Sequence, residues 1–438
     1  MSTEISREEP SIFGDAIASL KVLKAPLTTL SREHLPNQLP HREQQIRELT
    51  AAMANSIVHG TYRNFDVLGP AGTGKTSCVR LAFQQVKDGL EKESLHAEAK
   101  HKSVHMGLAN ASSHKSHHQY LITLTEALAA EAGGVKVDPL LLRNSPPLAL
   151  KELCRAVGGV IILVLDDLHK LKGQVKKEEY DDLICGFAEL NTALGPNGVV
   201  NVVATTTSAD TFQGLTPSTE QRFNPFKLNF PLYNGDQLYD ILDARSRETF
   251  KDGYVTPEAL RYISDEVAAE SGSARSALEM LLAAADRASS LRAEHITLEA
   301  AIWAKSESER RQVAETVSGL PLRAKMFLNL IYLHAQKYPA RPITFAAMWE
   351  AYRQLPPPFG GNMSDKPARG WLARIRDDGL VDTTLSHGGR NRGTQTIITP
   401  TARVDAVLAA IQKDPAFAPP TKPGGNGGQH RFVVDEGH

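Results

Sequence analysis

Short strand-like segments alternate along the first half of the chain with segments of helical periodicity. One of them, Val160–Leu165, is an uninterrupted apolar run, and a strand without polar alternation is typical of a parallel sheet that is covered on both faces. The runs that predict strands are Phe65–Leu68, Ser103–Met106, Val160–Leu165, Val199–Thr205 and Phe226–Phe230. Ahead of the first strand, apolar residues recur every three or four positions, at Ile46, Leu49, Met53 and Ile57. This pattern predicts an α/β fold with a parallel sheet.

After Pro231 the pattern becomes purely helical. The predicted helices cover Asp236–Phe250, Pro257–Ser271, Ala274–Ser290 and Thr297–Lys305. From Val313 three further helices precede two short strands, Val381–Leu385 and Gln395–Ile398. Three helices followed by a β-hairpin predict a winged helix, a variant of the helix-turn-helix.

These changes divide the 438 residues into five parts. We expect an N-terminal arm (1–26), a nucleotide-binding α/β domain (27–232), a helical lid (233–312), a winged-helix domain (313–412) and a disordered tail (413–438). One compact core rarely serves so long a chain. Hydrophobic residues make up 41% and charged residues 23%, as in ordinary globular proteins.

Charge is unevenly distributed. The whole chain carries a net charge of −1, which predicts no general attraction to nucleic acid or membranes. From Pro321 to Gln412, however, twelve Lys/Arg face six Asp/Glu, a formal charge of +6. We therefore expect DNA to bind the winged helix, while a winged helix used for protein contacts remains the alternative.

No apolar stretch has the length of a membrane span, and the start of the chain lacks the apolar core of a signal peptide. The three cysteines are far apart and form no C-x-x-C spacing, so they predict neither a disulfide framework nor a zinc site. We expect a cytoplasmic, nucleoid-associated protein that uses no membrane.

The strongest chemical signal is a complete phosphate-binding loop, G-x-x-x-x-G-K-T, between the first strand and a helix. It comprises Gly69, Pro70, Ala71, Gly72, Thr73, Gly74, Lys75 and Thr76. Its glycines allow backbone N–H groups to surround phosphate oxygens, its lysine reaches the β- and γ-phosphates, and its threonine hydroxyl ligates Mg²⁺. ATP or ADP with Mg²⁺ is the predicted cofactor.

Two carboxylates, Asp166 and Asp167, end the most apolar strand, at the sheet edge where α/β folds place ligands. Asp166 is predicted to orient the Mg²⁺ that Thr76 holds, and Asp167 to polarise the attacking water. A hydroxyl of Thr205–Thr207, at the end of the next strand, is in reach of the γ-phosphate or the water in this arrangement.

The predicted third helix of the winged domain has a buried stripe of Ala368, Trp371, Leu372 and Ile375. Three basic residues, Lys366, Arg369 and Arg376, share another face. The hairpin tip 388–393 carries Arg390 and Arg392 between glycines. These five residues are the predicted DNA contacts, the helix in the major groove and the tip along phosphates or the minor groove.

The motifs together resemble the archaeal origin-recognition and cell-division-cycle replication initiators, which are AAA+ ATPases with a C-terminal winged helix. The resemblance covers about Leu27 to Gln412. Besides the phosphate loop and the Asp166–Asp167 strand, it rests on Leu39-Pro40-His41-Arg42-Glu43, Phe230-Pro231-Leu232-Tyr233, Gly272-Ser273-Ala274-Arg275 and Ile296-Thr297.

This resemblance implies further roles. The turn Leu39, Pro40, His41 and Arg42 would line the adenine side, and Tyr233 would join the nucleotide-binding residues. Arg275 would be the lid arginine called sensor two, and Arg222 an arginine finger acting on a neighbouring subunit's nucleotide. Family members also contact origin DNA through an extra helix, which we expect within Pro139–Val157.

Two positions depart from the family pattern. Asp167 replaces the usual glutamate, and Thr206 stands where a sensor-one asparagine is usual. Both departures favour slow hydrolysis, or long-lived ATP binding used as a switch.

The sequence thus predicts an ATP-binding initiator that recognises double-stranded origin DNA, self-associates on it and helps to recruit or load the replicative helicase, with weak ATPase activity. The alternatives are a clamp-loader or helicase-type ATPase with rapid turnover, and a nucleotide-switched transcription regulator.

Overall fold

The computed structural model describes residues 22–31, 34–92, 99–356, 359–361, 364–387 and 394–417. Contacts within the chain separate two compact units, Met1–Ala304 and Lys305–His438.

A parallel five-stranded sheet forms the centre of the first unit, in the order β2-β3-β4-β1-β5. Its strands are β1 (Phe65–Leu68), β2 (Val104–Asn110), β3 (Gly159–Asp166), β4 (Gly198–Thr206) and β5 (Phe226–Asn229). All five predicted strands are confirmed, and β2 extends beyond its predicted end at Met106. The order places the end of β4 between the end of β1 and the two aspartates that follow β3.

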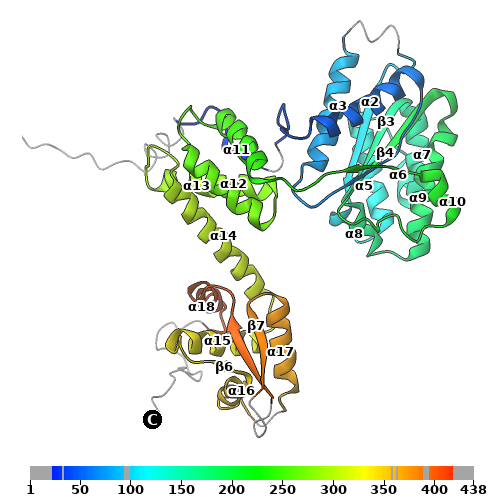
Figure 1. Ribbon diagram of the computed structural model, residues 1–438. Helices are drawn as coiled ribbons and strands as arrows, with labels where there is room; N and C mark the ends of the chain where they lie inside the picture. The colour runs from blue at the N-terminus through cyan, green and yellow to red at the C-terminus, as the bar shows by residue number, and fades with distance from the viewer. Residues whose placement is uncertain are drawn as a thin grey trace, which may run out of the picture. The chain divides into compact units, whose positions relative to one another are not determined.

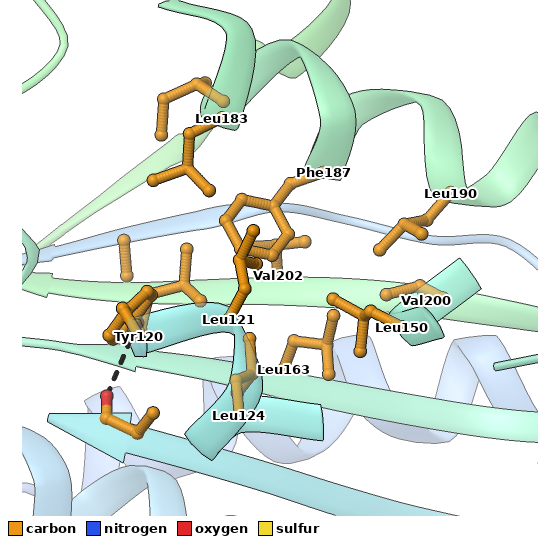
Figure 2. Close-up of a cluster of buried hydrophobic side chains, with 14 of the residues drawn as sticks. Tyr120, Leu121, Leu124, Leu150, Leu163, Leu183, Phe187, Leu190, Val200 and Val202 are labelled. Carbon is orange, nitrogen blue, oxygen red and sulfur yellow. Dashed lines mark hydrogen bonds between the residues drawn. The ribbon is translucent and has the colours of Figure 1, made fainter. Parts of the chain in front are cut away.

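Helices cover both faces of this sheet (Figure 1). They are α2 (Glu43–His59), α3 (Lys75–Leu90), α5 (His117–Glu131), α6 (Pro139–Asn144), α7 (Pro146–Val157), α8 (Leu168–Lys172), α9 (Lys177–Leu194) and α10 (Pro217–Phe223), with 3₁₀ turns η2 (Ala111–Ser113) and η3 (Gly195–Asn197). On one face α2 and α3 bury Val160, Ile162 and Val203. On the other, α5, α7 and α9 bury Leu163, Val200 and Val202 (Figure 2). Successive residues of β3 and β4 therefore point into different cores.

The lid belongs to the same unit and consists of α11 (Gly235–Thr249), α12 (Pro257–Glu270), α13 (Ala274–Ser290) and the start of α14 (Leu298–Ser318). The N-terminal segment packs on the lid, although the sequence assigned the residues from 27 to the α/β domain. Leu30, in the 3₁₀ turn η1 (Leu27–Leu30), is buried in the lid core, and Leu23 forms a bridge with Phe250. The rest of the predicted arm, residues 1–21, lies outside the described residues.

The helix α14 is longer than predicted. The sequence predicted a helix that ends at Lys305 and a second that begins near Val313, but α14 continues from Leu298 to Ser318 and the second helix, α15 (Leu322–Lys337), begins later. The intervening residues 306–312 contain neither glycine nor proline, so nothing in them breaks the helix.

The second unit is a winged helix, as predicted. Its elements are α15 (Leu322–Lys337), β6 (Ile343–Thr344), α16 (Phe345–Arg353), α17 (Lys366–Asp377), β7 (Val381–His387), β8 (Thr394–Pro400) and α18 (Val404–Gln412). The strands form an antiparallel sheet in the order β6-β8-β7. Phe327, Tyr352 and Trp371 meet in its core. The sequence did not predict α18, and most of the predicted tail, residues 418–438, lies outside the described residues.

Candidate functional site

A cavity of about 1030 Å³ lies at the carboxyl edge of the parallel sheet, between the sheet and the lid. Four parts of the first unit line it: residues 31 and 34–40, the phosphate loop with the start of α3, the ends of β2, β3 and β4, and the lid helices α11 and α13. Many of the predicted nucleotide-site residues line this one cavity.

The phosphate loop has the backbone that its glycines predict. Gly72 and Gly74 have φ angles of 77° and 87°, in the left-handed region that side chains disfavour. A Cβ on Gly72 would overlap the Ser273 hydroxyl oxygen of the lid. The Ala274 N–H also donates a hydrogen bond to the Gly72 carbonyl at 3.1 Å. The loop and the start of α13 are therefore in direct contact.

Lys75 is buried, and its ammonium group donates to the carbonyl oxygens of Gly69 and Pro70 at 2.7 and 2.8 Å. Burial lowers the pKa of Lys75, while the nearby carboxylates of Asp167 and Asp166 oppose that shift. The Lys75 ammonium group is thus held by two backbone carbonyls of the loop, near the carboxylates of Asp166 and Asp167. Gly69, Pro70 and Thr73 shape the loop without lining the cavity.

Asp166 and Thr76 meet at the base of the cavity. The Thr76 hydroxyl donates to Asp166 Oδ1 at 2.6 Å, and the Thr205 hydroxyl donates to the same oxygen at 2.7 Å. The Asn110 amide donates to Asp166 Oδ2 at 2.9 Å. Three hydrogen-bond donors thus fix the Asp166 carboxylate beside the Thr76 hydroxyl, which is a second oxygen that can ligate a metal ion. Such hard oxygen donors suit Mg²⁺, so the residues present fit the predicted metal.

Asp167 directly precedes α8 and lines the cavity with a φ of 54°, a left-handed conformation uncommon for a non-glycine residue. Its N–H donates to the Thr205 hydroxyl at 3.0 Å. Thr205 therefore holds both aspartates, one through its hydrogen and one through its oxygen. This connection fixes the turn in which Asp167 projects toward the phosphate loop.

Thr206 does not reach the cavity, contrary to the sequence expectation. Its buried hydroxyl donates to Asp66 Oδ1 at 2.7 Å, on the opposite face of the sheet. Side chains alternate along a strand, so Thr205 points to the phosphate-loop face when Thr206 does not. Thr207 lines the cavity.

The N-terminal turn contributes only half of its predicted residues. Leu39 and Pro40 line the cavity, but His41 and Arg42 do not. The His41 ring instead contacts Asp240 at 2.8 Å. The sequence could not separate these roles, because the resemblance covered the turn as a whole.

Arg42 is buried beneath the cavity. Its guanidinium donates to the carbonyls of Thr73, Pro231 and His41 at 3.0, 2.6 and 3.1 Å. It also stacks on Tyr233, 3.8 Å from the ring centroid. Arg42 therefore links the phosphate loop to the segment that enters the lid, and it stabilises the site without lining the cavity.

The lid contributes Tyr233 and Arg275 to the cavity lining, as the sequence predicted. The Tyr233 hydroxyl donates to the Thr73 carbonyl at 3.2 Å, so Tyr233 and Arg42 hold the same carbonyl. Arg275 lies in the first turn of α13, one residue after the contact between Ala274 and Gly72. Its charge opposes the protonation of Lys75, which places the two cations near each other.

Arg222 lies outside the cavity, at the end of α10. It is exposed and pairs with Glu189 at 2.6 Å. The sequence predicted that it acts on a neighbouring subunit, so its distance from this chain's own cavity leaves that prediction in place.

The basic residues of α17 are exposed on the second unit, and its three arginines each contact an acid near them in sequence. Arg369 pairs with Asp365 at 2.8 Å and lies over the Phe345 ring, 4.6 Å from its centroid. Arg374 and Arg376 pair with Asp378 and Asp377, both at 2.9 Å. Lys366 is the first residue of the helix. Arg390 and Arg392 lie outside the described residues.

Sequence reasoning missed several groups at the cavity. Asn110 ends β2, and His169 follows Asp167 by two residues on α8. Asn110 lies four residues beyond the predicted end of its strand at Met106, and His169 lies close after the two acids, so the rule that ligands bind beyond the carboxyl ends of parallel strands pointed to this region. Thr205 was considered only as a contact of the phosphate or the water, whereas its visible bonds hold the two aspartates.

Comparison with known proteins agrees with this architecture. Residues 38–196 match the model of the AAA ATPase domain, and residues 239–306 match that of the Cdc6 AAA+ ATPase-type lid domain. An ORC1-type DNA replication protein 1 of Aeropyrum pernix is 28% identical over 394 residues, which cover 88% of this chain and 94% of that protein. Its counterpart in Sulfurisphaera tokodaii is 24% identical over 413 residues, 91% of this chain and 98% of that protein.

Solved structures give the same result. The Aeropyrum pernix ORC1 protein in complex with DNA superposes with a TM-score of 0.65 at 25% identity, over 90% of this chain and 98% of that one. Cdc6p from Pyrobaculum aerophilum, at 22% identity and a TM-score of 0.54 over 90% of this chain and 98% of that one, shares the fold. The chain combines the phosphate loop, the lid and the winged helix, and it matches these models and relatives. It therefore belongs to the archaeal Orc1/Cdc6 family of AAA+ ATPases.

Proposed function

We propose that this protein is an ATP-binding DNA replication initiator that recognises origin DNA and helps to recruit or load the replicative helicase. The observation that carries the proposal is the single cavity on which Lys75, Thr76, Asp166 and the lid residue Arg275 converge. A winged helix with a formal charge of +6 between Pro321 and Gln412 supports DNA as the partner. The relatives named above are DNA replication proteins.

ATP binding would use groups that the first unit already holds in place. Thr76 and Asp166 would hold Mg²⁺, which neutralises phosphate charge when it is bound. Lys75 and the loop N–H groups would bind the phosphates, and Arg275 would join them from the lid. Because α13 touches the loop at Gly72, the lid is in position to respond to the nucleotide.

Hydrolysis is proposed to be slow, so that the bound nucleotide acts as a switch. Asp167 lines the cavity but is one methylene shorter than glutamate, which leaves its carboxylate further from an attacking water. Arg222 would complete the site of a neighbouring copy when several copies assemble on DNA. Among the described helices, none combines the length and the apolar character that a membrane span requires.

Replacement of the loop lysine tests the nucleotide site. We expect Lys75→Ala to abolish the binding of ATP and ADP, because it removes the cation that faces the phosphates. Equilibrium titration with a fluorescent ATP analogue measures the loss, and Arg374→Ala, which also removes one positive charge but an exposed one on the other unit, is the control. Undiminished binding by Lys75→Ala would refute the site.

Replacement of the shorter acid tests the switch. We expect the wild-type protein to turn over well below roughly 1 s⁻¹, and Asp167→Glu to hydrolyse ATP faster because its carboxylate reaches further. Release of inorganic phosphate, with and without DNA, measures both rates. A wild-type rate of several per second would contradict the switch, and would favour an ATPase driven by rapid turnover.

A further inference from the structure

The end of α15 and the turn after it carry a cluster of basic and aromatic side chains that none of the roles above uses. This α15 cluster consists of His334, Lys337, Tyr338 and Arg341. Lys337 and Arg341 are exposed, and Tyr338 is half-buried. The Arg341 guanidinium lies over the Tyr338 ring, 4.8 Å from its centroid, and the Lys337 ammonium group is 5.5 Å from the same centroid.

No nearby acid balances the charge of the α15 cluster. Between Glu315 and Glu350 the sequence has four Lys/Arg and neither Asp nor Glu. Within the part of the chain that the structure describes, Lys337 and Arg341 have no acidic partner. All three arginines of α17, by contrast, contact acids. The α15 cluster can therefore attract an anion without first releasing a carboxylate.

A tight turn holds Arg341 against Tyr338. The Arg341 N–H donates to the Tyr338 carbonyl at 3.1 Å, and Pro339 occupies the second position of this turn, where its fixed φ is favourable. The His334 ring packs against Tyr338, with 5.2 Å between the ring centroids. Because the backbone and the tyrosine are held in this way, a ligand that binds to the stack orders few further groups.

A guanidinium stacked on an aromatic ring, beside a second cation, suits an unpaired nucleotide. Bases of single strands stack on aromatic rings and on arginine guanidinium planes, while a basic surface follows their phosphates. The bases of a duplex are stacked on one another, so a duplex offers only its backbone to such a surface. The outer face of the Arg341 guanidinium is therefore open to an unpaired base.

We propose that the α15 cluster binds an unpaired strand of nucleic acid. Arg341, supported by Tyr338, stacks on a base, and Lys337 contacts a phosphate of the same strand. The site uses none of the residues assigned to duplex DNA on α17 and the hairpin tip, and it does not depend on the nucleotide cavity.

Fluorescence anisotropy of the full-length protein tests the site, with labelled oligo-dT and oligo-U and with a duplex of equal length, each of about 20 nucleotides to exceed a single-strand site. We expect Tyr338→Leu to weaken both single strands by at least about fivefold, because the stack is lost, and Tyr338→Phe to bind them as the wild type does. A preference for oligo-dT or oligo-U identifies DNA or RNA as the source of the strand.

Salt dependence separates the charge from the stack. Lys337→Gln should reduce the slope of log affinity against log salt concentration by about 0.7 with a single strand and leave the duplex unchanged. Arg341→Lys should keep the slope but weaken the single strands, because it retains the charge and loses the plane. Arg374→Gln, which removes an exposed charge from α17, is the control and should leave single-strand binding unchanged.

Two results would overturn the site. One is a wild-type protein that binds neither oligo-dT nor oligo-U, or variants of the α15 cluster that bind them as tightly as the wild type. The other is equal weakening of the duplex and the single strands by Lys337→Gln and Tyr338→Leu, which would make the cluster part of the duplex interface. Weakening of the duplex alone by Arg369→Ala would support two separate contacts.

Discussion

Arg42 of the first unit and Arg369 of the second are held in opposite ways. Arg42 in the first unit is 2% exposed, and its guanidinium donates to three backbone carbonyls. The Arg369 side chain in the second unit is 61% exposed, and its partner is Asp365, four residues earlier. Backbone carbonyls are fixed hydrogen-bond acceptors in the folded unit. An exposed ion pair contributes little to stability, and its side chains exchange easily to other partners. The first arginine is part of the framework, and the second is available to a ligand.

Removal of the framework arginine should give the largest effect. Arg42→Ala removes the donor to the Pro231 carbonyl, leaves the Thr73 carbonyl with the Tyr233 hydroxyl as its donor, and removes the stack on Tyr233. We expect the free energy of unfolding of the first unit to fall by about 3 kcal/mol. Urea denaturation measures it, with Arg374→Ala as the exposed control that should change stability by less than about 0.5 kcal/mol. Similar losses in both variants would break the comparison.

In the second unit, we expect replacement of an arginine to change the affinity for DNA rather than the stability. We expect Arg369→Ala to cost roughly 1 to 3 kcal/mol of DNA binding and to relax sequence preference, if its guanidinium leaves Asp365 for a guanine edge. Arg374, set nearly opposite to Arg369 round α17, should matter less. Titrations with duplex DNA at several salt concentrations compare the two.

The same DNA titrations test the hairpin tip 388–393. Its predicted DNA contacts, Arg390 and Arg392, remain a prediction from the sequence. Removal of Arg390 or Arg392 should weaken all DNA alike and reduce the salt dependence by about one unit. Equal damage from Arg374→Ala and Arg369→Ala, or no effect from either tip arginine, would show that DNA does not contact the assigned face.

A buried carboxylate in the first unit should give a smaller effect, of opposite sign. Burial raises the pKa of Asp66, against the Thr206 hydroxyl and Lys227, which lower it. The folded state therefore keeps this proton to a higher pH than the unfolded state does. Its contribution to stability is present at low pH and is lost as pH rises from the ordinary value of 3.8 through the raised pKa.

Asp66→Asn removes that loss and keeps an oxygen that accepts from Thr206. We expect the variant to be more stable than the wild type at neutral pH by on the order of 1 kcal/mol, and the advantage to shrink in acid. Urea midpoints across the acid range follow it. An advantage that is constant with pH would mean that Asp66 is not the group responsible.

Sequence reasoning located best the residues whose chemical role and backbone position are set by the same motif. The glycines of the loop, Lys75, Thr76 and Asp166 all lie where the motif requires. The choice of Thr206 failed for a physical reason: β4 is buried on both faces, so no alternation of buried and exposed positions revealed which threonine faces the loop. Asp66 was the missing clue, because its carboxylate draws Thr206 to the other face.

Arg42 and α14 show two further limits. A buried arginine and a ligand-binding arginine have the same letter, and only the three carbonyls around Arg42 reveal its role. The sequence predicted a helix end at Lys305, but residues 306–312 contain neither glycine nor proline, and α14 continues through them.

The contact between Gly72 and the lid has a consequence for how substitutions at this site would be tolerated. The phosphate-loop motif leaves this position open to any residue, and yet the left-handed backbone and the nearby Ser273 hydroxyl leave room for glycine alone. A side chain there would act as a wedge between the loop and α13. Position 72 is thus a place where a single mutation could uncouple lid closure from phosphate binding while every consensus residue of the motif stays intact.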